Sequence, residues 1–173
     1  MDIDELIARE QIRDALARYA RGVDRLDLEV ALSAFHPGAV DHHGKSVGEV
    51  AATLPEIFER VRGHLADSHF LCSSSITFHS STQAAVETYA IGFHRLAGET
   101  GARDLQIGLR YVDRFERRDG EWRIAERHVI EDWRRIDDVR SDVPPSAFEA
   151  GRRDRADRSY RFGVGHSVMT NPG

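Results

Sequence analysis

Two kinds of hydrophobic spacing divide this chain, and they constrain its fold more than any single motif. Before residue 63, apolar residues recur every three to five positions, as they do on one face of a helix. From His69 onward the apolar segments are short, rich in β-branched and aromatic residues, and separated by polar turns. Helices followed by a run of strands predict an α+β domain, in which helices cover one face of a curved antiparallel sheet.

Three helices are expected in the first part of the chain. Asp2 followed by Glu5 has the pattern of a capping box, and so has Ser46 followed by Glu49. The run His-Pro-Gly at 36–38 opposes continuation of the second helix. The expected helices span residues 3–23, 28–35 and 46–63.

Four strands are expected after the helices. Asp119 and Gly120 form a strong hairpin signal between the last two of them. The expected strands span residues 69–78, 84–94, 105–116 and 121–133. The chain then becomes polar and carries an arginine-rich run, so we expect a domain over residues 1–135 and a surface extension over 136–173, either a pocket lid or a subunit contact.

Composition narrows the class of protein. A length of 173 residues suits one domain with a sizeable core. Its 24 basic and 29 acidic residues alternate and give a net charge of −5, which disfavours a nucleic-acid partner. The one cysteine, Cys72, excludes an internal disulfide and a cysteine-based zinc cluster. No apolar run approaches the roughly 20 residues that span a bilayer, and the start is acidic, so we expect a cytoplasmic protein without a membrane partner.

The histidines and glycines do not show the spacing of a known metal or nucleotide site. His42 and His43 project to opposite sides of an extended chain, and His128 with Glu131 would need a helix where a strand is expected. No glycine-rich phosphate loop follows an expected strand. We therefore expect no metal and no cofactor.

Four ionisable residues stand in apolar surroundings, and each has a structural alternative. Tyr19 lies on the apolar face of the first helix, and Asp24 comes directly after the last residue of that face. A buried core tyrosine is the structural alternative for Tyr19, and a helix cap is the alternative for Asp24. His69 opens an apolar strand and Arg127 lies in the last one; they are also explained as a paired core histidine and a solvated or ion-paired arginine. Near neutral pH an imidazole held by a carboxylate is well suited to proton transfer.

Three segments carry a family resemblance over residues 5 to about 135. The helix ending Tyr19-Ala-Arg-Gly-Val-Asp24, the strand opening Ser68-His69-Phe70 and the hairpin 116–122 leading to Arg127 resemble the SnoaL-like branch of the nuclear transport factor 2-like superfamily. The resemblance implies a cone-shaped fold whose curved sheet wraps an apolar pocket. Within the branch the pattern looks like the cofactor-independent lyases: hexachlorocyclohexane dehydrochlorinase, bile acid 7α-dehydratase and, more distantly, scytalone dehydratase.

The resemblance implies a role for each of the four residues. His69, held by Asp24, would remove a proton from carbon. Tyr19 would donate a hydrogen bond or a proton to the leaving oxygen, and Arg127 would stabilise negative charge or hold a substrate oxygen. The dehydrochlorinase has a lysine where this chain has Tyr19, whereas the bile acid dehydratase has a tyrosine, which favours an oxygen leaving group over a halide. A homo-oligomer, with a trimer favoured, is also implied.

The expected activity is a metal-independent lyase acting on a hydrophobic, hydroxylated aromatic or polycyclic small molecule. Carbon–carbon cleavage with release of an aldehyde uses the same groups. A non-catalytic binding module and an isomerase or cyclase of the same fold are the alternatives. The residues expected to line the substrate pocket are Leu16, Phe35, Phe58, Leu71, Tyr89, Phe93 and Tyr111.

Overall fold

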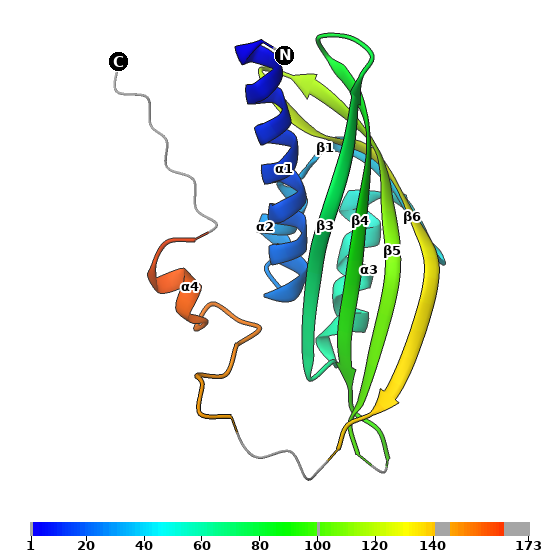
Figure 1. Cartoon of the computed structure of the whole chain (residues 1–173), viewed down its shortest axis with the longest axis vertical. Helices are drawn as coiled ribbons and strands as arrows, with labels where there is room; N and C mark the ends of the chain where they lie inside the picture. The colour runs from blue at the N-terminus through cyan, green and yellow to red at the C-terminus, as the bar shows by residue number, and fades with distance from the viewer. Residues whose placement is uncertain (1, 100, 141–145, 165–173) are drawn as a thin grey trace.

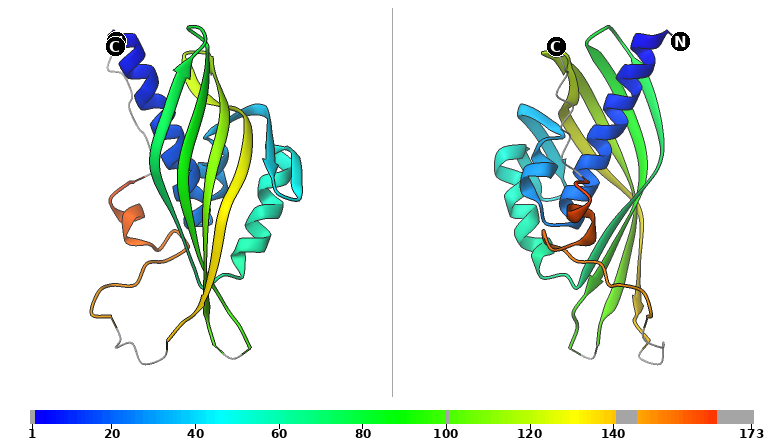
Figure 2. Two further views of the ribbon diagram at one scale, coloured as in Figure 1. Left: turned by 45° about the vertical axis from the view of Figure 1, so that its right-hand side comes forward. Right: turned by 90° about the vertical axis from the view of Figure 1, so that its left-hand side faces the viewer.

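A curved sheet of six strands forms one layer of the molecule, and the first three helices cover one of its faces (Figure 1, Figure 2). The computed structural model describes residues 2–99, 101–140 and 146–164. The helices are α1 (Ile3–Asp24), α2 (Leu28–Leu32), α3 (Val50–Arg62) and α4 (Arg158–Arg161). The strands are β1 (Phe35–His43), β2 (Ser46–Glu49), β3 (Ala66–Phe78), β4 (Gln83–Leu96), β5 (Arg103–Arg118) and β6 (Glu121–Asp138). The predicted α+β class is confirmed.

The strand order is β2-β1-β6-β5-β4-β3. Neighbouring strands are antiparallel except β1 and β6, which run parallel. The four strands predicted from the sequence are therefore consecutive neighbours, and β1 and β2 extend the sheet beyond β6. Asp119 and Gly120 connect β5 to β6 with positive φ angles of 52° and 86°, which are those of a type I′ turn.

The first helix begins and ends close to the predicted positions. The Asp2 carboxylate accepts a hydrogen bond from the backbone N–H of Glu5 at 2.8 Å, which satisfies one of the free donors of the first turn. The buried face of α1 includes Leu16 and Tyr19, which pack in the hydrophobic core. Asp24, the last residue of α1, follows this face and reaches β3.

The end of the second helix differs from the prediction. It ends at Leu32, and Phe35 already begins β1. The His-Pro-Gly run at 36–38 lies within β1, at a shift in the register between β1 and β6, and Gly38 adopts a φ of 76°. Proline and glycine stop a helix, as expected, but at a strand irregularity they are tolerated.

The start of the third helix also differs. Ser46 is not its cap; it pairs with His43 in the short hairpin of β1 and β2. The helix starts at Val50, and Glu49 precedes it without a side-chain capping hydrogen bond. The segment at Ser46 is a strand because it pairs with β1. A capping pattern depends on neighbouring residues alone, so it could not predict this pairing.

Alternation along the strands defines two faces of the sheet. On β4, Thr88 and Ala90 are buried under the helices, whereas Tyr89 between them is 49% exposed on the opposite side. We call these the inner face and the outer face. The inner face and the helices enclose the core, and the outer face carries several exposed apolar side chains: Phe70, Tyr89, Val112 and Ile130.

Gly22 allows α1 and α2 to approach closely, and this contact yields a stability prediction. A Cβ added at Gly22 would lie 2.4 Å from the backbone nitrogen of Ala31, so the two helices would have to separate. We expect Gly22→Ala to lower the free energy of unfolding by about 3 kcal/mol, as overpacking does. Urea denaturation measures this change, with Gly63→Ala as control because a Cβ there meets no atom within 4 Å. Equal stability of the two variants would contradict the prediction.

The segment after β6 returns to the helices (Figure 1). The Tyr160 hydroxyl donates to Asp27 at 2.8 Å, and Arg21 donates to the Ser159 hydroxyl at 3.0 Å and lies over the Tyr160 ring. β6 itself continues to Asp138, past the predicted domain end at 135. Among the described helices none is both long enough and apolar enough to cross a membrane.

Candidate functional site

Asp24 and His69 meet where α1 ends against β3. Asp24 Oδ1 lies 2.7 Å from His69 Nδ1, and Oδ2 accepts the backbone N–H of His69 at 3.0 Å. The carboxylate therefore fixes both the imidazole and its strand, and it selects the tautomer protonated at Nδ1. The side chains are 15% and 8% exposed. Nε2 of His69 forms no hydrogen bond with any described residue, which leaves it available as a base.

A second imidazole, His94 on β4, lies beside the first. The ring centroids of His69 and His94 are 5.7 Å apart, with the planes at 74°. Asp67 Oδ1 binds Nδ1 of His94 at 2.6 Å and Nδ1 of His64 at 2.8 Å. Gly92 pairs with His69, and a Cβ there would lie 3.1 Å from Nε2 of His94 and 3.9 Å from Nε2 of His69. A side chain at this position would crowd the His94 ring, so glycine allows the imidazole to lie close to the β4 backbone.

The sequence analysis missed Asp67 and His94. The signal that could have found them is strand parity, because Asp67 lies two residues before His69 and faces the same side. His94 was within a predicted strand, but only the register between β3 and β4, which pairs Asp67 with His94, brings it to the site. That register is not encoded in either strand alone.

Arg153, in the C-terminal segment, closes this cluster. It forms an ion pair with Asp67 and donates from Nη1 to the backbone oxygens of Val61 and His64 at 2.8 and 2.9 Å. Its Nε donates to the backbone oxygen of Asp24 at 3.4 Å. One side chain of the extension thus joins the ends of α1 and α3 to β3, around the two imidazoles. The extension contacts its own chain here, and its expected role as a lid or a subunit contact stays a prediction.

The charge of Asp67 predicts a pH-dependent contribution to stability. Burial alone would raise its pKa, but hydrogen bonds from His64 and His94 and the charge of Arg153 outweigh burial, so the pKa is lowered. A lowered folded-state pKa contributes stability above the unfolded value of about 3.9, and this contribution is lost as the pH falls through the folded value. We expect Asp67→Asn to cost about 2 kcal/mol at pH 7 and less near pH 3. Denaturation at both pH values measures this difference.

A control for this prediction is Asp14→Asn, which removes an exposed ion pair with Arg18 on α1. We expect a change of no more than about 0.5 kcal/mol for this variant at pH 7. An equal loss for Asp67→Asn at both pH values would show that its negative charge does not contribute.

Arg127 lies on the inner face of β6 and is completely buried. Its Nε and Nη2 donate to the two oxygens of Asp113 on β5 at 2.8 and 2.7 Å. The guanidinium carbon lies 4.1 Å from the ring centroid of Tyr111 and 4.3 Å from that of Tyr19. Burial alone would lower the pKa of Arg127, but Asp113 reverses this effect and keeps the guanidinium charged. Nη1 is buried without a hydrogen-bond partner among the described residues.

Two buried tyrosines, Tyr19 and Tyr111, contact Arg127. The rings of Tyr19 and Tyr111 are 5.6 Å apart, edge to face. Burial raises the pKa of both phenols, although the charge of Arg127 opposes the shift. Both hydroxyls therefore stay protonated at neutral pH and are hydrogen-bond donors.

Asp41 is a further buried residue that the sequence analysis missed. It pairs with Arg127 in the parallel register of β1 and β6 and is fully buried. Neither of its carboxylate oxygens has a hydrogen-bond partner among the described residues, and His43 Nδ1 lies 3.6 Å away. Its charge raises the pKa of Tyr19. No strand was predicted at Asp41, so no parity argument was available.

Comparison with known families assigns the fold. Residues 4–128 match the family model of the SnoaL-like domain. The chain belongs to the SnoaL-like family. This match confirms the predicted SnoaL-like branch of the nuclear transport factor 2-like superfamily. The curved, unclosed sheet covered by helices agrees with the fold that this branch implies. Comparison with curated protein sequences gave no match.

Solved structures share this SnoaL-like fold. A candidate scytalone dehydratase from Novosphingobium aromaticivorans is 20% identical, with a TM-score of 0.70 over 86% of this chain and 100% of the other. Hexachlorocyclohexane dehydrochlorinase LinA-type3 from Novosphingobium barchaimii is 19% identical, with a TM-score of 0.72 over 84% and 100%. A candidate aromatic ring hydroxylase from N. aromaticivorans is 22% identical, with a TM-score of 0.66 over 78% and 94%. At these identities the likeness concerns the fold.

Two of the seven residues expected at the pocket of this SnoaL-like domain are on the wrong face. Tyr89 and Phe93 have the parity opposite to Ala90 and face outward; the Phe93 ring lies under Arg95. The sequence predicted where the strands lie but not which side of each strand faces the core, so it could not separate inner from outer positions. The other five lie in or against the hydrophobic core: Leu16, Phe35, Phe58, Leu71 and Tyr111. The expected homo-oligomer, with a trimer favoured, stays a prediction.

Proposed function

We propose that this chain is a cofactor-independent lyase that removes water from a hydroxylated, hydrophobic small molecule by β-elimination. The observation that carries the proposal is the 2.7 Å contact of Asp24 with His69 Nδ1, with Nε2 left available. Such a base, oriented by a carboxylate, is what abstraction of a proton from carbon requires. The dehydratase and dehydrochlorinase named among the similar folds support an elimination.

The proton steps follow from the positions of the side chains. Nε2 of His69 takes a proton from the carbon next to an activating carbonyl or aromatic ring, and the C–H electrons form the double bond. The imidazolium is stabilised by Asp24. The C–O bond to the neighbouring carbon breaks, and the hydroxyl takes up a proton and leaves as water. His94, whose Nδ1 contacts Asp67, is the second imidazole at the site and is the group that we assign to supply that proton.

Tyr19 and Arg127 have supporting roles in this mechanism. The Tyr19 phenol stays protonated, so it donates a hydrogen bond to a substrate oxygen more readily than it gives up its proton. Nη1 of Arg127, for which the described part of the chain offers no hydrogen-bond partner, is a buried cationic donor for an oxygen that gains negative charge in the transition state. The five apolar residues retained around the site favour an aromatic or polycyclic substrate.

The two neighbouring imidazoles also favour a second candidate function, an isomerase. One imidazole would remove a proton and the other would return it at a different carbon, with no change in formula. This reaction needs no leaving group and uses the same groups.

A panel of hydroxylated aromatic and polycyclic ketones, incubated with the purified chain in deuterated and ordinary water, tests both functions. A lyase gives a product that has lost one water and shows new conjugated absorbance, and the product forms in the presence of a chelator. An isomerase gives deuterium incorporation without loss of water. The matched variants are Asp24→Asn, which should lose turnover, and Asp14→Asn, which should retain it. Turnover that is equal in both variants would exclude the dyad from either reaction.

A further inference from the structure

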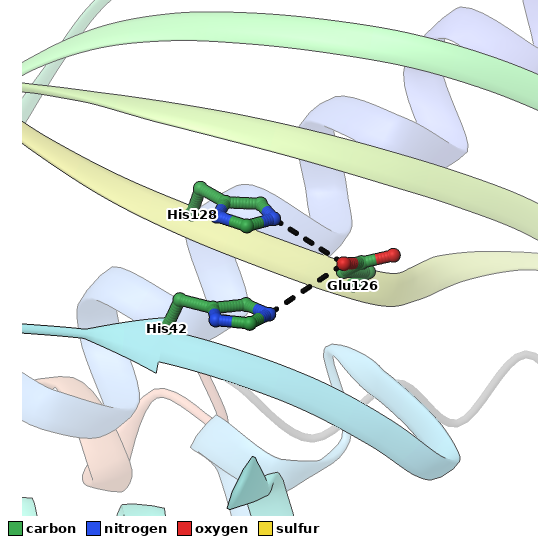
Figure 3. A group of neighbouring side chains, drawn as sticks. All are labelled: His42, Glu126 and His128. Atoms are coloured by element: carbon green, nitrogen blue, oxygen red, sulfur yellow. Dashed lines mark hydrogen bonds and ion pairs between the residues drawn. The ribbon is translucent and has the colours of Figure 1, made fainter. Parts of the chain in front are cut away.

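Two histidines and a glutamate gather on the outer face, away from the proposed active site. His42 on β1 and His128 on β6 are direct partners in the parallel register, and Glu126 lies two residues before His128 (Figure 3). In Figure 3 the two imidazoles lie side by side and point toward the same carboxylate. Distant parts of the sequence meet here only because β1 adds to the edge of β6.

The distances among these three side chains suit a small metal ion. The rings of His42 and His128 are stacked, with centroids 4.0 Å apart and planes at 6°. Glu126 Oε1 lies 3.5 Å from His42 Nε2 and 3.2 Å from His128 Nε2. Donors at the usual zinc distances of about 2.0–2.2 Å are about 3.3 Å apart around a tetrahedral ion. The nitrogen-to-oxygen separations already match this value, so small side-chain rotations are sufficient.

The chemistry and exposure of the three residues fit the same ligand. Neutral imidazole and carboxylate are preferred ligands of zinc and its divalent neighbours. The side chains are 33%, 36% and 46% exposed for His42, Glu126 and His128, so an ion enters without any opening of the fold. Arg114 donates to the other oxygen of Glu126 at 3.2 and 3.4 Å, which orients the carboxylate and leaves Oε1 toward the histidines.

A second histidine–carboxylate group in the described part of the chain is less suited to a cation. His64, Asp67 and His94 also bring three ligand atoms within 4.8 Å of one another. The carboxylate of Asp67, however, already binds both imidazoles and the guanidinium of Arg153. A divalent ion there would compete with a positive charge on a buried carboxylate. At the outer site Arg114 contacts the oxygen that faces away from the histidines.

We propose that His42, Glu126 and His128 form a binding site for a zinc-class divalent cation, with water in the remaining position. The ion joins β1 to β6. Asp41 and Arg127, the neighbouring pair on the same two strands, face inward. Binding to the folded chain alone stabilises it by mass action. The site lies on the opposite face of the sheet from His69, so it is independent of the proposed lyase chemistry.

Titration of the metal-free full chain with zinc chloride, followed by calorimetry and thermal unfolding, tests this site. We expect one ion per chain, and a melting temperature raised by about 5–10 °C at free zinc a hundredfold above Kd. His42→Ala and His128→Ala should each weaken binding at least tenfold, and Glu126→Gln about tenfold. These positions are partly exposed, so without metal each variant should melt within a few degrees of the native chain.

Two controls decide whether the ion binds at this place. His79→Ala removes an exposed histidine outside both groups and should leave zinc affinity unchanged. His94→Ala removes a ligand of the second group and should also leave it unchanged. The proposal is overturned if zinc does not bind at millimolar concentration, or if binding survives the loss of both His42 and His128 and disappears with His94.

Discussion

Replacement of His69 by alanine should lower kcat/KM of the proposed elimination by a factor of about 10²–10⁴. The variant removes the imidazole that Asp24 orients at 2.7 Å from Nδ1, while Tyr19 and Arg127 remain to bind substrate. The loss should therefore appear mainly in kcat, because the proton transfer belongs to the transition state and substrate binding is unaffected. Steady-state kinetics on a substrate from the ketone panel measures it.

Three further variants make the result specific to His69. His79→Ala should retain full activity because this histidine is exposed and outside the site. Asp24→Asn should lose activity while the imidazole remains, since the amide no longer stabilises the imidazolium. His94→Ala should slow the reaction if this residue supplies the proton for the leaving water. A folded His69→Ala variant that keeps more than about a tenth of native turnover would contradict the base assignment.

Replacement of Asp113 by alanine should lower the free energy of unfolding by about 3–5 kcal/mol, the largest stability change that we expect in this chain. Arg127 would remain charged and fully buried without its bidentate partner, and Asp41 provides no direct hydrogen bond to replace it. The cation–π contacts of the guanidinium with the rings of Tyr19 and Tyr111 compensate only part of this cost. Urea denaturation at pH 7 measures the change.

A matched surface pair and a double variant separate burial from charge. Asp104 binds Arg95 with the same two-point geometry at 2.7 and 2.8 Å, but this pair is partly exposed. We expect Asp104→Ala to cost less than about 1 kcal/mol. Asp113→Leu combined with Arg127→Met replaces the ion pair with apolar side chains and should recover most of the lost stability. Equal losses for Asp113→Ala and Asp104→Ala would show that burial does not determine the cost.

The sequence alone determined the parts of this protein that depend on local patterns. The periodicity of α1, its Asp2 cap, the four long strands and the Asp119-Gly120 turn are each encoded within a few neighbouring residues. The candidate dyad was predicted from the family resemblance of the segments around Asp24 and His69, since the local pattern alone also allowed a helix cap and a paired core histidine. Their 2.7 Å contact agrees with that prediction, and their catalytic role stays a proposal.

Only the tertiary structure decided which residues face one another across the sheet. β1 replaced the predicted end of the second helix, and β2 replaced the predicted start of the third. The pairing of β1 with β6 and of β2 with β1 outweighed the weak local helix signals. The register of β3 and β4 brought His94 beside His69, and strand parity turned Tyr89 to the outer face. The physical reason is that a strand records its own alternation, whereas its register and buried face are set by hydrogen bonds and packing with segments far away in the chain.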